Sequence, residues 1–359
     1  MQAAGGVDVA TVDVERLERW LADVVPGPGR LHVERLGAGH SNLTYAVTRG
    51  PQRWVLRRPP AGPLLPTAHD VLREYRVLDL LARSPAPVRV PAVVAACEDP
   101  EVLGAPFYLM EQVRGVVVRD ELPAWLTGPA RAELGRDLVA ALAEIHAVPP
   151  APFVEAGLGR PGGYLERQVR RWVAQREGIQ AAVAATGGRA RELPDYDAVR
   201  DWLTEQCPVE AAPSVVHGDY KLDNVVVRSP DRQVVQKGAP PVAAVLDWEM
   251  ATVGDARADL GYLLSFWAEP GEHHPLGALA VSGPGFPSRA ELVAVWEQET
   301  GRSAGDLTWF VTLAVWKLAV LLEASYHRYL SGTTDDPFFA RLEDGVPALF
   351  RRAREVCGG

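Results

Sequence analysis

The chain has 359 residues, of which 47% are hydrophobic and 23% are charged. This composition is typical of a globular protein with an ample core, and the length allows about two domains. The formal net charge of −9 argues against a nucleic-acid partner, because nucleic-acid binders need a basic surface. An ordinary acidic surface is the simpler explanation of this charge, and a preference for a cationic substrate is the alternative.

The cysteines and the longest apolar run bear on where in the cell the protein is expected to work. Cys97, Cys207 and Cys357 are far apart, forming neither a disulfide framework nor a metal-binding pattern, which suits a reducing cytoplasm. The first residues include early acidic side chains and do not resemble a signal peptide. The most apolar run, residues 307–322, contains Lys317 and is shorter than the ~18–20 residues of a membrane span. We therefore expect a soluble, cytoplasmic protein with no membrane partner.

The first 115 residues alternate helical and strand-like segments. Apolar side chains at helical spacing predict helices over 13–24, which a Pro/Gly-rich turn ends, and over 68–82. Short β-branched and aromatic runs predict strands near 31–36, 43–48, 53–57, 90–96 and 106–113.

From about residue 116 the composition becomes helical. An amphipathic helix is predicted over 131–147, where we interpret His146 as a core histidine, and a basic helix over 164–177. Pro and Gly predict a loop over 150–163, and residues 183–195 are interpreted as a flexible connection. The remaining helices are predicted over 260–268, 289–300 and 306–330.

Polar side chains with a distinctive spacing lie in two stretches. The first reads Val-Val-His-Gly-Asp-Tyr-Lys-Leu-Asp-Asn-Val-Val-Val from 215 to 227, and the second reads Val-Ala-Ala-Val-Leu-Asp-Trp-Glu from 242 to 249. Their apolar runs predict short buried strands whose ends present polar side chains to a cleft.

The spacing resembles the protein-kinase pattern H-R-D-x-x-x-x-N, whose Asp accepts the substrate hydroxyl proton and whose Asn binds Mg²⁺. Asp219 and Asn224 have this separation, and His217 stands two residues before the Asp. Asp247 stands where kinases place the metal-binding Asp of D-F-G. We therefore take Asp219 as the candidate base and expect His217 to tie the loop to neighbouring backbone. Asn224 and Asp247 offer the oxygen ligands that Mg²⁺ prefers.

Together with Gly-Asp-Ala-Arg-Ala-Asp-Leu at 254–260, these motifs resemble the aminoglycoside phosphotransferase and choline kinase superfamily. Residues 56–78, 106–115 and 159–172 are most similar to the kinase-like domains found beside, or fused to, acyl-CoA dehydrogenases. The resemblance covers roughly residues 30 to 330. It implies an α+β, bilobal, protein-kinase-like fold. Residues 1–111 would form a small antiparallel-sheet lobe with one helix, and residues 112–359 a larger, mainly helical lobe.

The resemblance also implies a nucleotide site in the smaller lobe. The turn at 37–42, Gly-Ala-Gly-His-Ser-Asn, is similar to a glycine-rich phosphate loop, which makes Gly39, Ser41 and Asn42 candidate ligands. A hairpin turn with two glycines is the alternative, and the catalytic motif downstream favours the phosphate loop. Met110, Glu111 and Val113 stand at the position of the hinge whose backbone holds adenine.

The strand cation of kinases is a Lys, but here the matching position carries Arg57. Since successive strand residues point to opposite faces, only one of Arg57 and Arg58 can enter the cleft, and we favour Arg57. Glu74 in the helix 68–82 is its expected partner. Surface ion pairs are the alternative for these side chains.

The resemblance implies an ATP- and Mg²⁺-dependent phosphotransferase that acts on a hydroxyl of a small molecule. A hydroxyacyl-CoA, another hydroxylated metabolite and an aminoglycoside all remain open as acceptors, and an acyl-CoA dehydrogenase is a candidate protein partner. The Arg at position 57 favours one alternative, a catalytically weak pseudokinase module that acts with a partner protein. Asp255 and Asp259 are expected to cap helix N-termini rather than bind metal.

Overall fold

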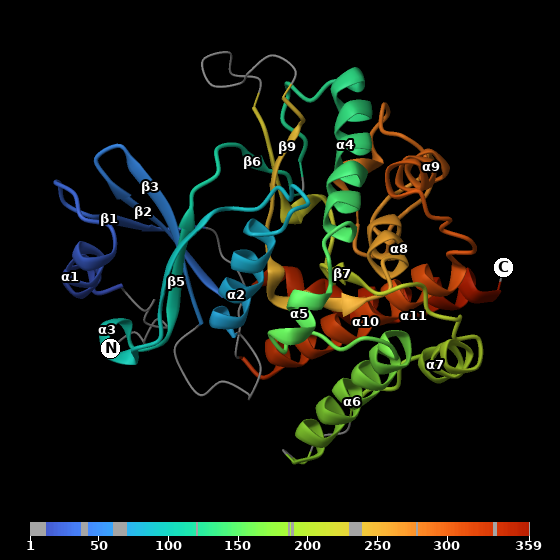
Figure 1. The fold of residues 1–359 in the computed structure, drawn as a ribbon. Helices are drawn as coiled ribbons and strands as arrows, with labels where there is room; N and C mark the ends of the chain where they lie inside the picture. Colours follow the sequence, from blue (N-terminus) through green and yellow to red (C-terminus); the bar gives the residue numbers. More distant parts are fainter. Residues whose placement is uncertain are drawn as a thin grey trace.

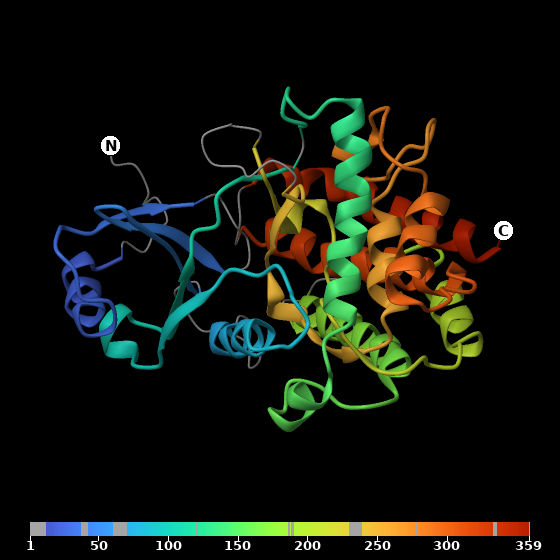
Figure 2. The same ribbon diagram turned by 45° about the horizontal axis from the view of Figure 1, so that its top comes forward.

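The computed structural model of the chain describes residues 12–36, 42–59, 70–119, 121–185, 187, 190–229, 239–277, 279–332 and 336–358. They form a smaller part built on a β-sheet and a larger, mainly helical part, which lie side by side in both views (Figures 1 and 2). This is the α+β, bilobal arrangement that the sequence predicts. Two of the candidate nucleotide ligands, Gly39 and Ser41, lie outside the described residues.

The sheet of the smaller part is antiparallel, with strand order β1-β2-β3-β5-β4. Its strands are β1 (His32–Arg35), β2 (Leu43–Arg49), β3 (Gln52–Arg58), β4 (Val93–Cys97) and β5 (Phe107–Glu111). Helix α2 (Val71–Ala82) packs against β4 and β5, and its first turn is capped by Asp70, which accepts a hydrogen bond from Arg73 N. Because α2 packs on this sheet, its position determines where the side chains of α2 meet those of the sheet.

Two more helices accompany this sheet at its outer end (Figure 1). Helix α1 (Val14–Val24) was expected from its periodicity, and it buries Leu17 and Leu21 in a core shared with the sheet residues Val47 and Leu56. The short α3 (Pro100–Leu103) was not expected. Its signal is Asp99 followed by Pro100, since Asp99 caps the helix and proline is well tolerated in a first turn.

The larger part contains two small antiparallel sheets that carry the polar motifs. Strands β6, β8 and β9 form one sheet, and β7 pairs with β10 in the other. These strands are β6 (Val116–Val117), β7 (Ser214–Val216), β8 (Val225–Val227), β9 (Val242–Val245) and β10 (Thr252–Gly254). Strand β6 was not predicted, since the composition becomes helical from about residue 116; it forms because its β-branched valines pair with β8.

Helices make up most of the larger part. They are α4 (Gly128–His146), α5 (Ala151–Glu155), α6 (Tyr164–Ala185), α7 (Tyr196–Glu205), α8 (Arg257–Ser265), α9 (Arg289–Thr300), α10 (Thr308–Leu330) and α11 (Leu342–Gly358), with 3₁₀ turns η1 (Leu222–Asn224), η2 (Trp248–Met250), η3 (Ala280–Ser282) and η4 (Pro337–Arg341). Helix α5 falls inside the predicted loop 150–163, where burial of Phe153 stabilises one turn of helix despite the flanking prolines.

Helix α10 is long and apolar enough to cross a membrane, but 67% of that apolar window is buried inside the protein. It packs against α6, α8 and α11, which confirms the prediction of a buried core helix. Its Glu323 is fully buried and lies 2.5 Å from Arg191 Nη2 and 3.7 Å from Arg176 Nη1. Arg191 belongs to the segment interpreted as a flexible connection, and it supplies the cation that this buried carboxylate needs.

Candidate functional site

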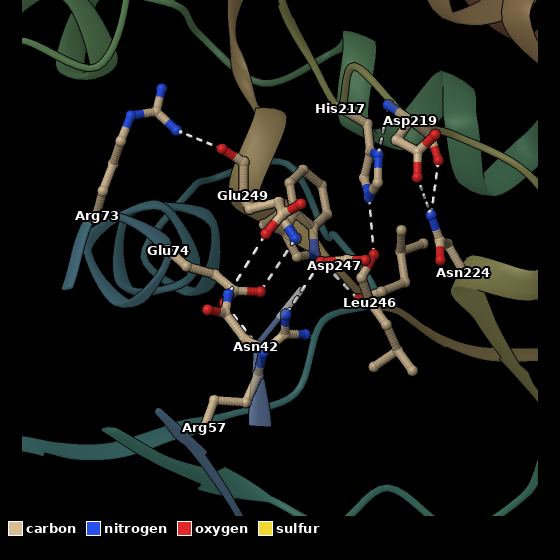
Figure 3. A network of polar contacts seen from close by, with 12 residues as sticks. Asn42, Arg57, Arg73, Glu74, His217, Asp219, Asn224, Leu246, Asp247 and Glu249 are labelled. Atoms are coloured by element: carbon tan, nitrogen blue, oxygen red, sulfur yellow. Dashed lines mark hydrogen bonds and ion pairs between the residues drawn. The ribbon is translucent and has the colours of Figure 1, made fainter. Parts of the chain in front are cut away.

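The loop between β7 and β8 places the predicted base. It turns at Gly218, whose φ of 86° lies in the left-handed region. A Cβ at this position would come 2.8 Å from the carbonyl oxygen of Met250, so both the conformation and the space require glycine. The turn η1 then brings Asn224 beside Asp219 (Figure 3).

Asp219 and Asn224 contact each other directly. The amide nitrogen Nδ2 of Asn224 donates to Asp219 Oδ2 and to the Asp219 carbonyl, at 2.8 Å in each case. Because Nδ2 is used in these two bonds, the oxygen Oδ1 of Asn224 is the atom that could bind a metal. Lys221, which the sequence argument passed over, lies with its Nζ 3.2 Å from Asp219 Oδ2. Its position two residues after the predicted base was the available signal.

Asp219 is held in its ionised form. Burial by itself would raise the pKa of this carboxyl, but Lys221, Lys317 and a hydrogen bond from the Tyr262 hydroxyl outweigh burial and hold the pKa below its usual value. The same carboxylate raises the pKa of Lys221 against the effect of burial, so that both partners stay charged. A carboxylate in this state accepts hydrogen bonds at neutral pH.

His217 links the loop to the strand that precedes Asp247. Its Nε2 donates to the Leu246 carbonyl at 2.8 Å, and its Nδ1 accepts from Asp219 N at 3.2 Å (Figure 3). These two bonds assign the proton to Nε2. The histidine therefore has the backbone-tethering position expected from the sequence and aligns the base with the second polar stretch.

Asp247 follows β9 and has φ 65°, an uncommon value for a residue other than glycine. Its Oδ1 lies 3.1 Å from Arg57 Nη2, which reaches it from β3 of the smaller part. Figure 3 shows Asp247 between the Asp219–Asn224 pair on one side and Arg57 with Glu74 on the other. The strained conformation directs this carboxylate between the two parts of the protein.

Arg57 bridges two carboxylates. Its Nε lies 3.2 Å from Glu74 Oε2, so the ion pair expected from the sequence forms, and its Nη2 reaches Asp247. Glu74 is 1% exposed and also accepts a hydrogen bond from Trp248 N at 3.2 Å. Burial raises the pKa of Glu74, and Arg57 opposes that rise. Burial disfavours the charge of Arg57, but Glu74 raises the pKa of Arg57 and keeps the guanidinium charged.

The neighbouring Arg58 makes different contacts, as the alternation of strand residues predicts. Its Nε donates to the Pro59 carbonyl at 3.4 Å. Among the other predicted ligands, Asn42 Nδ2 lies 3.4 Å from Glu249 Oε2, which brings the end of the glycine-rich turn to the segment after Asp247. Arg73 Nη1 donates to the Glu249 carbonyl at 3.1 Å, a second link from the smaller part that the sequence argument missed.

The predicted hinge begins inside β5. Met110 pairs with Val55 in the sheet, and the N–H of Glu111 donates to the Ala92 carbonyl at 2.8 Å. The sheet therefore uses the Glu111 N–H that was considered for adenine. No backbone hydrogen bond of Val113 is present among the described residues, so Val113 is the better candidate of the three for a nucleotide contact.

Asp259 has a larger role than the helix cap that the sequence suggested. It lies inside α8, fully buried, and its carboxylate accepts hydrogen bonds from His217 N at 2.6 Å and from Gly218 N at 2.8 Å. His146 Nε2 lies 3.4 Å away and Trp296 donates to His146 Nδ1, so His146 is a satisfied core histidine as predicted. Burial opposes the charge of Asp259, but the His146 hydrogen bond keeps its pKa low.

The other acidic residue of this motif behaves as expected. Asp255 Oδ1 accepts a hydrogen bond from the N–H of Arg257, the first residue of α8, at 3.0 Å. Asp255 also pairs with the Arg257 side chain. Spacing alone could not separate the two aspartates, because their roles depend on which of them faces the loop before Asp219.

We expect Asp259→Ala to lower the free energy of unfolding by about 3 kcal/mol, because charge-assisted hydrogen bonds to two buried N–H groups are lost. Urea unfolding followed by circular dichroism measures the change. The matched control is Asp197→Ala, which removes a carboxylate that is 75% exposed and should change stability by less than ~0.5 kcal/mol. Equal unfolding midpoints for Asp259→Ala and wild type would contradict the role of Asp259.

The donor atoms at the site fit a hard divalent cation. Asn224 Oδ1 and the Asp247 carboxylate provide one neutral and one charged oxygen, as Mg²⁺ sites shared with phosphate groups require. Among the described residues there is no group of three or more His, Cys, Asp or Glu side chains arranged to hold a metal by themselves. A cation held here would share its coordination with oxygens of a bound molecule.

Comparisons with known proteins agree with this geometry. A model of the family described as "Phosphotransferase enzyme family" matches residues 32–292. Acyl-CoA dehydrogenase family member 11 of Gallus gallus is 34% identical over 333 residues, covering 89% of this chain and 40% of the relative. The Homo sapiens protein of that name is 31% identical over 359 residues, covering 95% of this chain and 44% of the relative. The chain thus spans about two fifths of the length of these relatives.

Solved structures show the same fold. A Ralstonia eutropha protein, described as a candidate aminoglycoside phosphotransferase, is 31% identical with a TM-score of 0.75, covering 96% of this chain and 98% of the other. The GDP complex of aminoglycoside 2′-phosphotransferase-IIIa, 19% identical with a TM-score of 0.57, covers 96% of this chain and 99% of its own. On the extent of the family match and the identity to these relatives, the chain belongs to the phosphotransferase enzyme family, with the fold of the aminoglycoside phosphotransferases.

Proposed function

We propose that the protein transfers the γ-phosphoryl group of ATP to a hydroxyl of a small molecule, with Asp219 as the base. The observation that carries this proposal is that two separate stretches bring Asp219, Asn224 and Asp247 near one another, with Arg57 of the other part 3.1 Å from Asp247 (Figure 3). Family membership supports a small-molecule kinase, and GDP is bound to a relative of the same fold.

In this proposal, the chain's own residues have distinct tasks. Asp219 orients the acceptor hydroxyl and takes its proton, while Asn224 and Lys221 hold the Asp219 carboxylate in place. Arg57, positioned by Glu74, offers positive charge to phosphate oxygens. Mg²⁺, held by Asn224 and Asp247, would neutralise phosphate charge. Because the transition state of phosphoryl transfer is loose, positioning and electrostatics supply most of the rate enhancement.

The acceptor we propose is a hydroxylated acid, with a hydroxyacyl-CoA as the leading example. Lys221 and Lys317 both lower the pKa of the Asp219 carboxyl. Burial lowers the pKa of Lys317, Asp219 and Asp259 raise it, and Arg171 of α6 lies near enough to lower it as well. Positive charge around the base favours an anionic acceptor and disfavours a polycation. Kanamycin is bound in a related structure, so an aminoglycoside is the second candidate.

The similarity to proteins named as acyl-CoA dehydrogenases suggests the setting of this reaction. We propose that an acyl-CoA dehydrogenase is a functional partner and that the protein works in the cytoplasm. Co-purification of the two proteins from the native cells would test the partnership. Recovery of this chain without any dehydrogenase, under conditions that preserve weak complexes, would count against it.

Nucleotide binding is the first test. We expect Mg-ATP to raise the melting temperature of the wild type by several degrees, because a ligand that binds only the folded state stabilises it. Asp247→Ala should lose the extra shift that Mg²⁺ gives over ATP with EDTA. An absence of any response to ATP in the wild type would favour the pseudokinase alternative, which the arginine at position 57 first suggested.

Acceptor identity is tested by ADP release with three panels: hydroxyacyl-CoAs and free hydroxy acids, aminoglycosides, and amino alcohols. We expect turnover with the acidic panel. Activity confined to aminoglycosides would overturn the proposed acceptor class and leave the phosphotransferase proposal intact. Mass spectrometry should show the added phosphate on the hydroxyl.

A further inference from the structure

A buried lysine reaches the catalytic loop from a distant helix. Lys317 lies in the middle of α10 and is only 6% exposed. Its ammonium donates to the carbonyl of Gly218, the residue directly before Asp219. The same ammonium lies 4.4 Å from the ring centre of Tyr262 and 5.6 Å from that of Trp172. Aromatic faces stabilise a desolvated cation at such distances.

Burying the Lys317 ammonium costs free energy unless the ammonium makes favourable interactions in the protein. Neighbouring residues of α10 are apolar and buried, and a buried ammonium group loses its hydration. A methionine or leucine would fill the same space without that loss, and would leave only one carbonyl without a donor. The lysine therefore serves the loop rather than the stability of the core.

Two side chains of opposite charge, from two different helices, bind the backbone of the loop. Asp259 of α8 binds the N–H groups of His217 and Gly218, and Lys317 of α10 binds the Gly218 carbonyl. Helices α8 and α10 pack against each other, so the two charged groups are fixed relative to one another. Asp259 thus holds the two peptides that precede the Gly218 carbonyl, and Lys317 holds the Gly218–Asp219 peptide itself.

We infer that Lys317 is a positioning residue for phosphoryl transfer, which fixes the Gly218–Asp219 peptide by binding the Gly218 carbonyl with a buried ammonium group. The inference rests on the proposed role of Asp219 as the base. It assigns a task to α10, a helix that no motif in the sequence marked. Lys317 acts through Asp219 and does not need to touch either substrate.

The charge of Lys317 should change within the working range of pH. Burial lowers the pKa of Lys317 to about 8. Titratable and charged groups that face it come from the catalytic loop, α8 and α6: Asp219, Lys221, Asp259, Tyr262, Arg171 and Tyr164. Below pH about 8 the charged ammonium holds the Gly218 carbonyl, and above it this hydrogen bond loses the contribution of the charge. Activity of the wild type should therefore fall on the alkaline side of pH 8.

The test compares Lys317→Met with the wild type in kcat, KM for ATP and pH profile. We expect kcat to fall on the order of 10²-fold, as on removal of a preorganised charge, with little change in the KM for ATP. The alkaline fall should disappear, since the titrating group is absent. A purely structural role for Lys317 would leave the alkaline fall in place.

Thr312→Val is the matched control, since Thr312 is buried in the same helix and its hydroxyl has no hydrogen-bond partner among the described residues. It should retain the wild-type profile. A folded Lys317→Met protein with kcat within threefold of wild type and the alkaline fall of the wild type would overturn the inference.

A second measurement needs neither activity nor a variant of Lys317. The ¹³C carboxyl resonance of Asp219, assigned by its loss in Asp219→Asn, should show an inflection near pH 8 in the wild type as Lys317 deprotonates. A titration without that inflection overturns the inference. If the wild type transfers no phosphate to any acceptor but the inflection is present, the proposed function fails while the charge coupling stands.

Discussion

Asp219→Ala is expected to lower kcat by about 10³- to 10⁴-fold while ATP binding remains measurable, the upper range for loss of a positioned general base. The carboxylate is held by Asn224 at 2.8 Å and by Lys221 at 3.2 Å, and its pKa is kept low despite burial. The nucleotide contacts proposed for Arg57 and Val113 come from other elements and should survive. Steady-state ADP release measures kcat, and a Mg-ATP thermal shift reports binding.

Asp223→Ala is the matched control for this prediction. Asp223 is the next carboxylate along the same loop, its side chain is 43% exposed, and it also lies 3.7 Å from Lys221. Its removal should change kcat by no more than a few fold. Full turnover in Asp219→Ala would refute the assignment of the base, and equal losses in both variants would indicate that general negative charge near Lys221 matters instead.

Arg57→Met is expected to damage both stability and nucleotide binding. Removing one partner of a buried ion pair leaves a buried charge uncompensated, which costs about 3–5 kcal/mol. Here the abandoned group is Glu74, which is 1% exposed and whose pKa burial already raises. Chemical unfolding measures the stability loss. The Mg-ATP thermal shift should be reduced as well, because the proposed phosphate contact is gone.

The double variant Arg57→Met/Glu74→Gln separates these two effects. Neutralising Glu74 should restore most of the lost stability, since no unpaired charge stays buried, while nucleotide affinity and turnover stay low. Arg57→Lys provides the complementary comparison, because a lysine keeps the charge but cannot bridge Glu74 and Asp247 with a planar fork. Recovery of wild-type turnover in the double variant would show that Arg57 serves only to neutralise Glu74.

Much of the fold was predictable because its periodicities are local. The five strands of the first sheet and the helices α1, α2 and α4 fell within a few residues of their predicted bounds, since alternation and helical spacing show directly in the sequence. Elements stabilised by distant partners were missed. Strand β6 exists because Val116 and Val117 pair with β8, and α5 exists because Phe153 is buried.

The residues of the polar site also fall into those that local spacing identified and those that only the tertiary structure revealed. Spacing within one loop identified Asp219 and Asn224, and the strand frame identified Arg57. The side chains that control this loop lie far from it in sequence: Asp259 on α8 and Lys317 on α10. Asp259 was interpreted as a helix cap, and Lys317 only as an interruption of an apolar run. Neither residue type at its position implies a contact with Gly218.

The amino-acid sequence by itself determined the chemistry on offer: a carboxylate, an amide and a second carboxylate at a spacing that suits phosphoryl transfer, and a strand arginine to accompany them. Tertiary packing decided the protonation and the orientation of these groups. Helices α8 and α10 bury an anion and a cation against consecutive peptides of one loop, and Arg57 crosses between the two parts to reach Asp247. Such contacts depend on burial and on distance in space, which no local pattern of residues records.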